Sequence, residues 1–263
     1  MAVVDKDKFP FRRVPVQDAL AGARLEENRA LAGQIYDLLR KKVVELVLLP
    51  NQALSEKEVA SCLDTSKTPV REAFIRLAED RVVAIVPHSG TYVAAIDPEL
   101  AREGFHILSA LESSCAARAA EQASLAEIGK LRHQLENLRL PAEIGDAETF
   151  QEQLPLLHDA IFSVAGIPDA RKLIDATRFE IDRIQHLHRA NGWQPMNQSF
   201  AQLTAVVNAI AAHDGEKARD AMHEHLAFAE SLVDALNPGG PLHEMLLLLN
   251  KKQPEQRRGK KQP

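Results

Sequence analysis

The chain has 263 residues, of which 45% are hydrophobic and 26% charged, with a formal net charge of −5, so it exceeds the usual size of one domain and can fill more than one core. The N-terminal segment mixes acids and bases and no long apolar run is present, so we expect a cytoplasmic protein without a signal peptide or membrane span. Cys62 and Cys115 are isolated in helical patterns, which argues against a disulfide framework, a CxxC metal site and a nucleophilic cysteine.

The charge is distributed unevenly. Residues 1–96 hold 14 Lys and Arg against 13 Asp and Glu, residues 97–250 hold 12 against 23, and residues 251–263 hold 6 against 1. An acidic body repels phosphate and leaves contact with nucleic acid to a few cations of the N-terminal part, so the net charge does not exclude DNA binding. The basic residues 251–263 are predicted to form a disordered tail.

The N-terminal part predicts three helices and a hairpin. Apolar residues at helical spacing indicate a supporting helix: Leu31, Ile35, Leu38, Leu39 and Leu46. A short helix is predicted next, with Val59, Ala60 and Leu63 on its apolar face. The polar stretch 64–66 then interrupts the pattern as a turn and an N-cap would.

A third helix follows this turn, with Pro69 in its first turn, where the missing N–H is harmless. Its apolar positions recur at i, i+3, i+4 and i+7: Val70, Ala73, Phe74 and Leu77. Lys67, Thr68 and Arg71 share the polar face. This combination of cations and a hydroxyl at a helix N-terminus is typical of a helix that reads base edges and phosphates in the major groove.

A β-hairpin is predicted after the third helix. β-favouring residues occupy 82–86 and 91–93, and the turn His88-Ser89-Gly90 separates them. Glycine allows close backbone approach, so Gly90 and the His88 imidazole can meet a phosphate or the minor groove at the tip of a wing.

The run SEKEVASCLDTSKTPVREAFIRLAEDRVVAIVPHSGTYV resembles the winged helix-turn-helix of GntR-family transcriptional regulators of the FadR-like subgroup. The resemblance implies DNA contacts at Lys57, Ser66, Lys67, Thr68, Arg71, His88 and Gly90. Lys57 and Lys67 stand where arginine is usual, and an ammonium lacks the guanidinium fork that pairs with guanine. Asn51 and Arg81 stand where glycines are common in the family, which affects turns.

From residue 97 onward the pattern is helix upon helix. Helices are expected at 99–122 and at about 125–139, 146–165, 169–190, 196–212, 215–236 and 241–250. The fold class is therefore mainly α, a winged helix-turn-helix followed by a bundle of six to seven helices, whose centre is a usual place for a ligand. We predict four segments: an extension (1–28), the DNA-binding domain (29–96), the helical effector and dimerisation domain (97–250) and the tail.

The helical half resembles the FCD ligand-binding domain, through the segments LHDAIFSVAGIPDARKLI and AVVNAIAAHDGEKARDAMHEHL. The resemblance implies a divalent metal held by an Asp-x-x-x-His pair and two later histidines. His158 and His225 match two of these positions, whereas Leu154 and Leu203 occupy the other two. A metal such as Zn, Ni or Mn at His158 and His225 stays an alternative, because such ions prefer three or four protein ligands.

The effector predicted for this domain is a small-molecule metabolite. Leu108 replaces an arginine that is common in FCD domains, so a small carboxylate loses a usual partner. A more apolar cavity with a few polar side chains is expected, suited to a larger or less charged ligand. The candidate side chains are His106, His158, His188 and His225.

The predicted mechanism is that of a transcriptional repressor or activator and not an enzyme. A homodimer binds a palindromic operator on double-stranded DNA, since paired half-sites mirror protein symmetry, and ligand occupancy acts through linker residues 94–99. One alternative is an all-helical metal-dependent hydrolase that uses the histidines, although an HExxH motif, a nucleophile elbow and a phosphate loop are lacking. The second alternative is a DNA-binding protein that needs no ligand.

Overall fold

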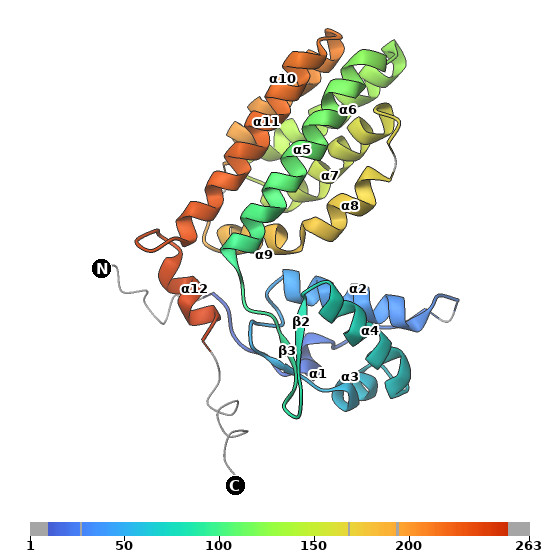
Figure 1. Ribbon diagram of the computed structural model, residues 1–263, viewed down its shortest axis with the longest axis vertical. Helices are drawn as coiled ribbons and strands as arrows, with labels where there is room; N and C mark the ends of the chain where they lie inside the picture. Colours follow the sequence, from blue (N-terminus) through green and yellow to red (C-terminus); the bar gives the residue numbers. More distant parts are fainter. Residues whose placement is uncertain (1–9, 27, 168, 193–194, 252–263) are drawn as a thin grey trace. The chain divides into compact units, whose positions relative to one another are not determined.

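The computed structural model describes residues 10–26, 28–167, 169–192 and 195–251. The chain divides into two compact units (Figure 1). The first unit, called the head below, comprises the chain up to Asp97 together with residues 182–187 and the segment from Leu236 onward. The second unit, called the helical domain, comprises Pro98–Ile181 and His188–Ala235. Nearly all of the predicted basic tail lies outside the described residues.

The head begins with a short helix, α1 (Val16–Ala19), and the supporting helix α2 (Leu31–Val44). Ile35, Leu39 and Val43 are buried at helical spacing on α2. Leu31, which we expected on this stripe, is 37% exposed at the start of the helix. The helix also ends before Leu46, which has a left-handed φ of 53° and is buried after the helix rather than within it.

The two predicted reading helices are α3 (Glu56–Cys62) and α4 (Lys67–Glu79). The Ser55 hydroxyl caps α3 by accepting a hydrogen bond from the Glu58 amide. All four predicted apolar residues of α4 are buried, and α4 packs against α2 and α3. The helix periodicity therefore determines which face of α4 remains open to solvent.

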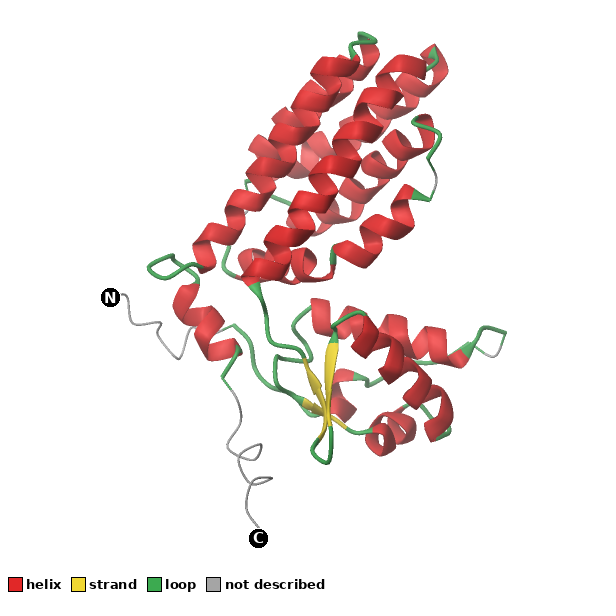
Figure 2. Ribbon diagram, in the orientation of Figure 1, coloured by secondary structure: helices red, strands yellow, loops and turns green. Residues whose placement is uncertain are grey.

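The hairpin consists of β2 (Val83–Val86) and β3 (Gly90–Val93), with Val86 opposite Gly90 and Val83 opposite Val93. A third strand, β1 (Ala53–Leu54), pairs antiparallel with β3, so the order is β1-β3-β2 (Figure 2). We did not predict β1, because two residues carry no alternation of apolar and polar side chains. Gly90 begins β3 instead of ending the turn.

The helical domain begins with α5 (Pro98–Gln122), and its remaining helices run in chain order as follows: α6 (Leu125–Ile144), α7 (Ala147–Val164), α8 (Ala170–Thr177), α9 (Phe179–Ala190), α10 (Met196–Ala211) and α11 (Gly215–Ser231). A 3-10 turn, η2 (Leu232–Leu236), follows α11. The last helix, α12 (His243–Leu249), belongs to the head, as do residues 182–187 of α9. In Figure 1, α11 lies along α5 and α10, and α6 lies along α7 and α10. The predicted helix at 169–190 is interrupted at Arg178, which ends α8 and precedes α9. The predicted mainly α fold class is confirmed.

Candidate functional site

The polar face of α4 is open to solvent. Lys67, Thr68 and Arg71 are all exposed, and so is the N-cap residue Ser66. Ser66 makes no capping hydrogen bond within the described part of the chain, so its hydroxyl remains available to another partner. The free amides and the positive end of the helix dipole favour an anion at this N-terminus, and the two cations add to that preference.

A bidentate ion pair joins α4 to α3. Arg71 donates from Nε to Glu56 Oε1 at 3.1 Å and from Nη2 to Glu56 Oε2 at 2.9 Å. The hydrogen bond to Glu56 raises the pKa of Arg71. The predicted contact residue Lys57 follows Glu56 on α3 and is exposed.

The hairpin tip is exposed and internally braced. Tyr92 donates its hydroxyl hydrogen bond to the Ser89 carbonyl at 2.9 Å, and its oxygen lies 2.8 Å from the Ser89 hydroxyl. His88 and Gly90 have positive φ values of 60° and 126°. There is room for a side chain at Gly90, because an added Cβ would meet only Tyr92 at an ordinary contact distance. Glycine is required here because of the positive φ, which other residues rarely adopt.

The two positions where the related family commonly has glycine are both left-handed. Asn51 has φ 60° in the turn before β1, and Arg81 has φ 58° after α4. The backbone therefore keeps the glycine conformation although the side chains differ. Asn51 tolerates it better than Arg81, because asparagine is among the residues that visit this region most readily.

The backbone after β3 is held by two side chains, Arg183 and Asn250, which we call the linker clamp. Arg183, on α9, is fully buried and donates to the carbonyls of Ala94 at 2.9 Å and Ala95 at 3.3 Å. Asn250 accepts from the Ile96 amide and donates to the Ile96 carbonyl, both at 2.8 Å. Four hydrogen bonds therefore tie the predicted linker to segments from much later in the chain.

A buried polar cluster lies within the helical domain. His158, on α7, donates from Nδ1 to Glu112 Oε2, on α5, at 2.6 Å. The His225 ring, on α11, lies 5.8 Å from the His158 ring, centroid to centroid. All three side chains are at least 95% buried. Glu112 Oε1 and His225 Nδ1 are buried without a hydrogen-bond partner among the described residues.

Burial and charge set the protonation of this cluster. Burial alone would raise the pKa of Glu112, but the charge and hydrogen bond of His158, aided by Arg178 and His225, lower it. Burial lowers the pKa of His225 to about 3, with His158 and Arg178 adding to that effect against Glu112. The cluster at neutral pH thus contains a carboxylate and a neutral His225.

The residues present do not fit the divalent metal that an FCD domain would imply. Leu154 and Leu203 are buried where two further ligands would be needed. His158 Nδ1 and Glu112 Oε2 are hydrogen-bonded to each other directly. Two atoms that both bind one ion, each through a bond of about 2 Å, would lie farther apart than this. No group of three or more His, Cys, Asp or Glu side chains in the described ranges has the arrangement of a metal site. The alternative of a Zn, Ni or Mn ion at His158 and His225 is therefore not supported.

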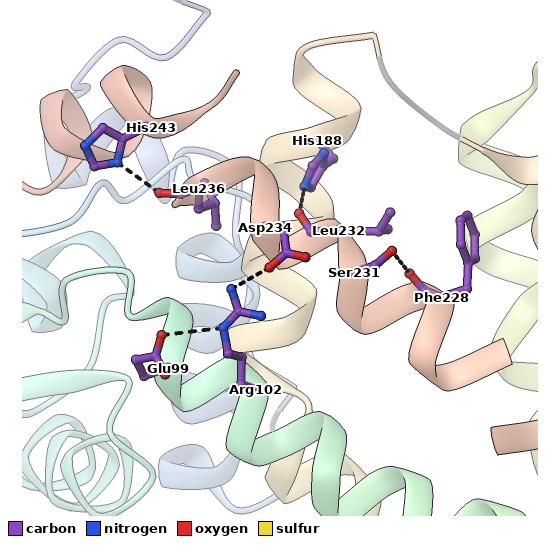
Figure 3. Close-up of polar contacts among 9 residues, drawn as sticks. All are labelled: Glu99, Arg102, His188, Phe228, Ser231, Leu232, Asp234, Leu236 and His243. Carbon is purple, nitrogen blue, oxygen red and sulfur yellow. Dashed lines mark hydrogen bonds and ion pairs between the residues drawn. The ribbon is translucent and has the colours of Figure 1, made fainter. Parts of the chain in front are cut away.

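The other two predicted effector histidines do not join the cluster. His106 is exposed on α5. His188, on α9, is buried and donates from Nε2 to the Leu232 carbonyl at 2.8 Å (Figure 3). Burial lowers the pKa of His188 against the opposing effect of that hydrogen bond. Its position beside η2 is consistent with a structural role.

The helical domain has two further features, an ion-pair bridge and a surface groove. Arg102 bridges Glu99 and Asp234, as Figure 3 shows, and joins α5 to the segment after α11. A groove of about 530 Å³ lies between α6 and α7 and is lined in part by Lys130 and Gln134. None of the four predicted effector histidines lines this groove.

Sequence reasoning missed Glu56, Glu112, Arg183 and Asn250. A signal existed for Glu112, because it lies on the apolar stripe of α5, between Leu108 and Cys115, where an acid must find a partner. The other three gave no local signal, since their partners are set by tertiary packing.

An exposed basic helix beside a braced wing, followed by an all-helical unit with a buried polar cluster, defines the class of DNA-binding regulators that carry a second, helical domain. Residues 31–93 match the family described as bacterial regulatory proteins, gntR family, and residues 103–228 match the FCD domain. Among the described helices, none combines the length and hydropathy needed to cross a membrane.

Individual relatives agree with these matches. The HTH-type transcriptional repressor RspR of Escherichia coli is 30% identical over 203 residues, which cover 77% of this chain and 89% of RspR. A Streptomyces ambofaciens HTH-type regulator from an unstable DNA locus is 30% identical over 207 residues, covering 79% and 86% of the two chains. The chain therefore belongs to the GntR family of transcriptional regulators and has an FCD domain.

The structure of E. coli McbR/YncC has the same fold, with a TM-score of 0.65 at 23% identity over 78% of this chain and 97% of that one.

The relatives are transcriptional regulators rather than enzymes, as we predicted. The alternative of a metal-dependent hydrolase is therefore wrong.

Proposed function

We propose that a homodimer of this chain represses transcription by binding a palindromic operator, and that a small molecule in the helical domain controls this binding. The observation that carries the proposal is the exposed face of α4, where a hydroxyl and two cations stand beside the wing. The proposed DNA contacts are Lys57, Ser66, Lys67, Thr68, Arg71, His88 and Gly90. The name of RspR, a repressor, supports the direction of regulation.

Within this group Arg71 is assigned to base reading, because a guanidinium can pair with guanine O6 and N7 through two parallel N–H groups. Lys57 and Lys67 are assigned to phosphates, where a point charge is sufficient. The backbone amides at the start of α4, together with His88 and Gly90 at the wing tip, are assigned to further phosphates of the DNA backbone. Phosphate contacts fix the register, so sequence preference rests mainly on Arg71.

We infer the dimer from the small number of base pairs that one head can read. A single α4 reads only a few base pairs, and two heads related by a two-fold axis read two half-sites about one helical turn apart. The helical half of the sequence carries the acidic excess, which disfavours DNA contact there and leaves its surface available for subunit contact. We assign residues 97–250 to dimerisation and effector binding, residues 29–96 to DNA binding, and residues 1–28 and 251–263 to flanking segments.

Control by an effector is proposed to act through the linker clamp. Helix α9 is continuous from Phe179 to Ala190, yet its residues 182–187 group with the head. A small displacement of α9 would alter how Arg183 holds Ala94 and Ala95. The effector must bind the two states of this linker with different affinity, and a typical coupling is about 1–3 kcal/mol.

The effector site is proposed to include Glu112, His158 and His225, without a metal. Glu112 Oε1 and His225 Nδ1 both lack partners in the described structure, and unsatisfied buried polar atoms are costly. A carboxylate accepts hydrogen bonds only, so the ligand group facing Glu112 must donate one. This chemistry favours a hydroxyl, amide or amine over a second carboxylate. His106 and His188, predicted earlier as effector contacts, are weaker candidates.

The test is selection of duplex fragments from genomic DNA by the purified full-length chain at about 150 mM salt, because affinities for DNA depend strongly on salt. We expect one enriched sequence with two inverted half-sites, and loss of most binding when either half-site is scrambled. Enrichment of a single unrepeated site would contradict the dimer. Binding without sequence preference, unaffected by any metabolite, would support the alternative of a ligand-independent DNA-binding protein.

A further inference from the structure

Arg71 is oriented by a neighbour on another helix. Glu56 lies in the first turn of α3, and both of its carboxylate oxygens accept hydrogen bonds from the Arg71 guanidinium of α4. The bonds use one edge of the guanidinium, formed by Nε and Nη2. This edge-on arrangement fixes the plane and direction of the Arg71 side chain.

The opposite edge of the guanidinium remains available. Arginine has five N–H groups, and the pair with Glu56 uses two of them. In the described structure the three N–H groups left on Nη1 and Nη2 have no partner. One from each nitrogen points along the outer edge, which is the parallel pair needed for guanine O6 and N7. Arg71 can therefore bind Glu56 and a base at the same time.

The pair contributes little to the stability of the fold. The Arg71 and Glu56 side chains are 65% and 31% exposed, and exposed ion pairs are weakened by water and salt. The hydrogen bond from Arg71 outweighs partial burial and lowers the pKa of Glu56, with the charges of Arg71 and Lys67 adding to it. Glu56 is therefore an ionised acid on the proposed DNA-binding face, where it repels phosphate.

We propose that Glu56 is a positioning residue that presents the outer edge of Arg71 to a guanine, so that it increases sequence preference while it decreases affinity for DNA of any sequence. The inference rests on the proposed function, because it requires Arg71 to read a base. Orientation matters here because a flexible arginine finds phosphates and bases alike, whereas a fixed fork fits one base edge.

The experiment compares dissociation constants for two duplexes at about 150 mM salt: the fragment selected by the wild-type protein and a scrambled duplex of the same composition. Glu56→Gln should tighten binding to the scrambled duplex and reduce the operator-to-scrambled preference by about tenfold, as expected when one bidentate contact is weakened. Glu58→Gln is the matched control, since it removes the same charge from α3 but does not contact Arg71 within the described residues. It should leave the preference unchanged.

A double-mutant cycle separates this inference from the proposed function. In an Arg71→Ala background, Glu56→Gln should cause no further loss of preference. The positioning role is contradicted if Glu56→Gln keeps the wild-type preference, if Glu58→Gln lowers it equally, or if the effect of Glu56→Gln persists without Arg71. If Arg71→Ala itself keeps the full preference, base reading by this helix fails, and the inference fails with it.

Discussion

The head and the helical domain each contain a pair of an acidic and a basic side chain. The two pairs differ mainly in how deeply they are buried. Glu56 and Arg71 are partly exposed on the head, whereas Glu112 and His158 are almost wholly buried in the helical domain. Water screens the first pair, so breaking it has little effect on folding and mainly changes what the surface binds. The second pair excludes water, so each partner depends on the other. The exposed pair is therefore proposed to serve recognition, whereas the buried pair stabilises its domain besides its proposed place in the effector site.

The largest effect is expected from breaking the buried pair. His158→Leu should lower the unfolding free energy of the helical domain by about 3–5 kcal/mol, because it leaves the Glu112 carboxylate buried without its partner. Denaturant unfolding measures the change. The double variant Glu112→Leu with His158→Leu should regain most of the loss, and His133→Leu at an exposed site of α6 should have no effect. Equal stability of wild type and His158→Leu would contradict the comparison.

Acid should destabilise the helical domain through His225. Its pKa is about 3 when folded and has an ordinary value of 6.5, so between these values the unfolded chain binds a proton that the folded chain does not. The stabilisation is complete above pH 6.5 and decreases as the pH falls. The loss approaches about 1.4 kcal/mol per pH unit and is roughly 2 kcal/mol at pH 5.

Unfolding curves at pH 7 and pH 5 test this, and His225→Leu should show a smaller difference between them than the wild type. Glu112 does not confuse the result, because its ordinary pKa of 4.5 lies below this window. The same pH dependence in wild type and His225→Leu would mean that other groups cause it.

A smaller effect is expected at the linker clamp. Asn250→Ala removes two hydrogen bonds to the buried Ile96 backbone and should lower the stability of the head by about 1–2 kcal/mol. Hydrogen exchange of the Ile96 amide should increase as well. Asn208→Ala, at an exposed position of α10, is the matched control. Unchanged exchange at Ile96 would show that Asn250 does not hold the linker.

The smallest effect on folding is expected at Arg71. Arg71→Ala should leave the thermal midpoint of unfolding unchanged, because its pair with Glu56 is exposed to solvent. Differential scanning calorimetry at low and high salt measures this. A clear decrease in the midpoint would show that the pair stabilises the head, and the contrast between the two regions would then be lost.

The sequence predicted the head more completely than the buried cluster, because its signals are local. The buried stripe of α4 and the polar face follow from helix periodicity. The positive φ of Asn51 and Arg81 agrees with the glycines that the family resemblance implies at these positions. In contrast, Glu112 and His158 are 46 residues apart. Their pairing depends on how α5 packs against α7, which periodicity does not specify.

Other differences have the same cause. The strand β1 forms because β3 offers a partner, and two residues alone do not predict it. The contact between Asn250 and Ile96 spans 154 positions and lies in no motif. The interruption at Arg178 separates two helical segments that share an unbroken helical pattern.

The most direct test of the account is a crystal structure of the full-length chain bound to its selected operator. We predict that α4 lies in the major groove, with Arg71 Nη1 and Nη2 on guanine O6 and N7 while Nε and Nη2 remain on Glu56. Arg71 released from Glu56 and bound to a phosphate, or turned away from the DNA, would contradict the assignment of this exposed pair to sequence reading.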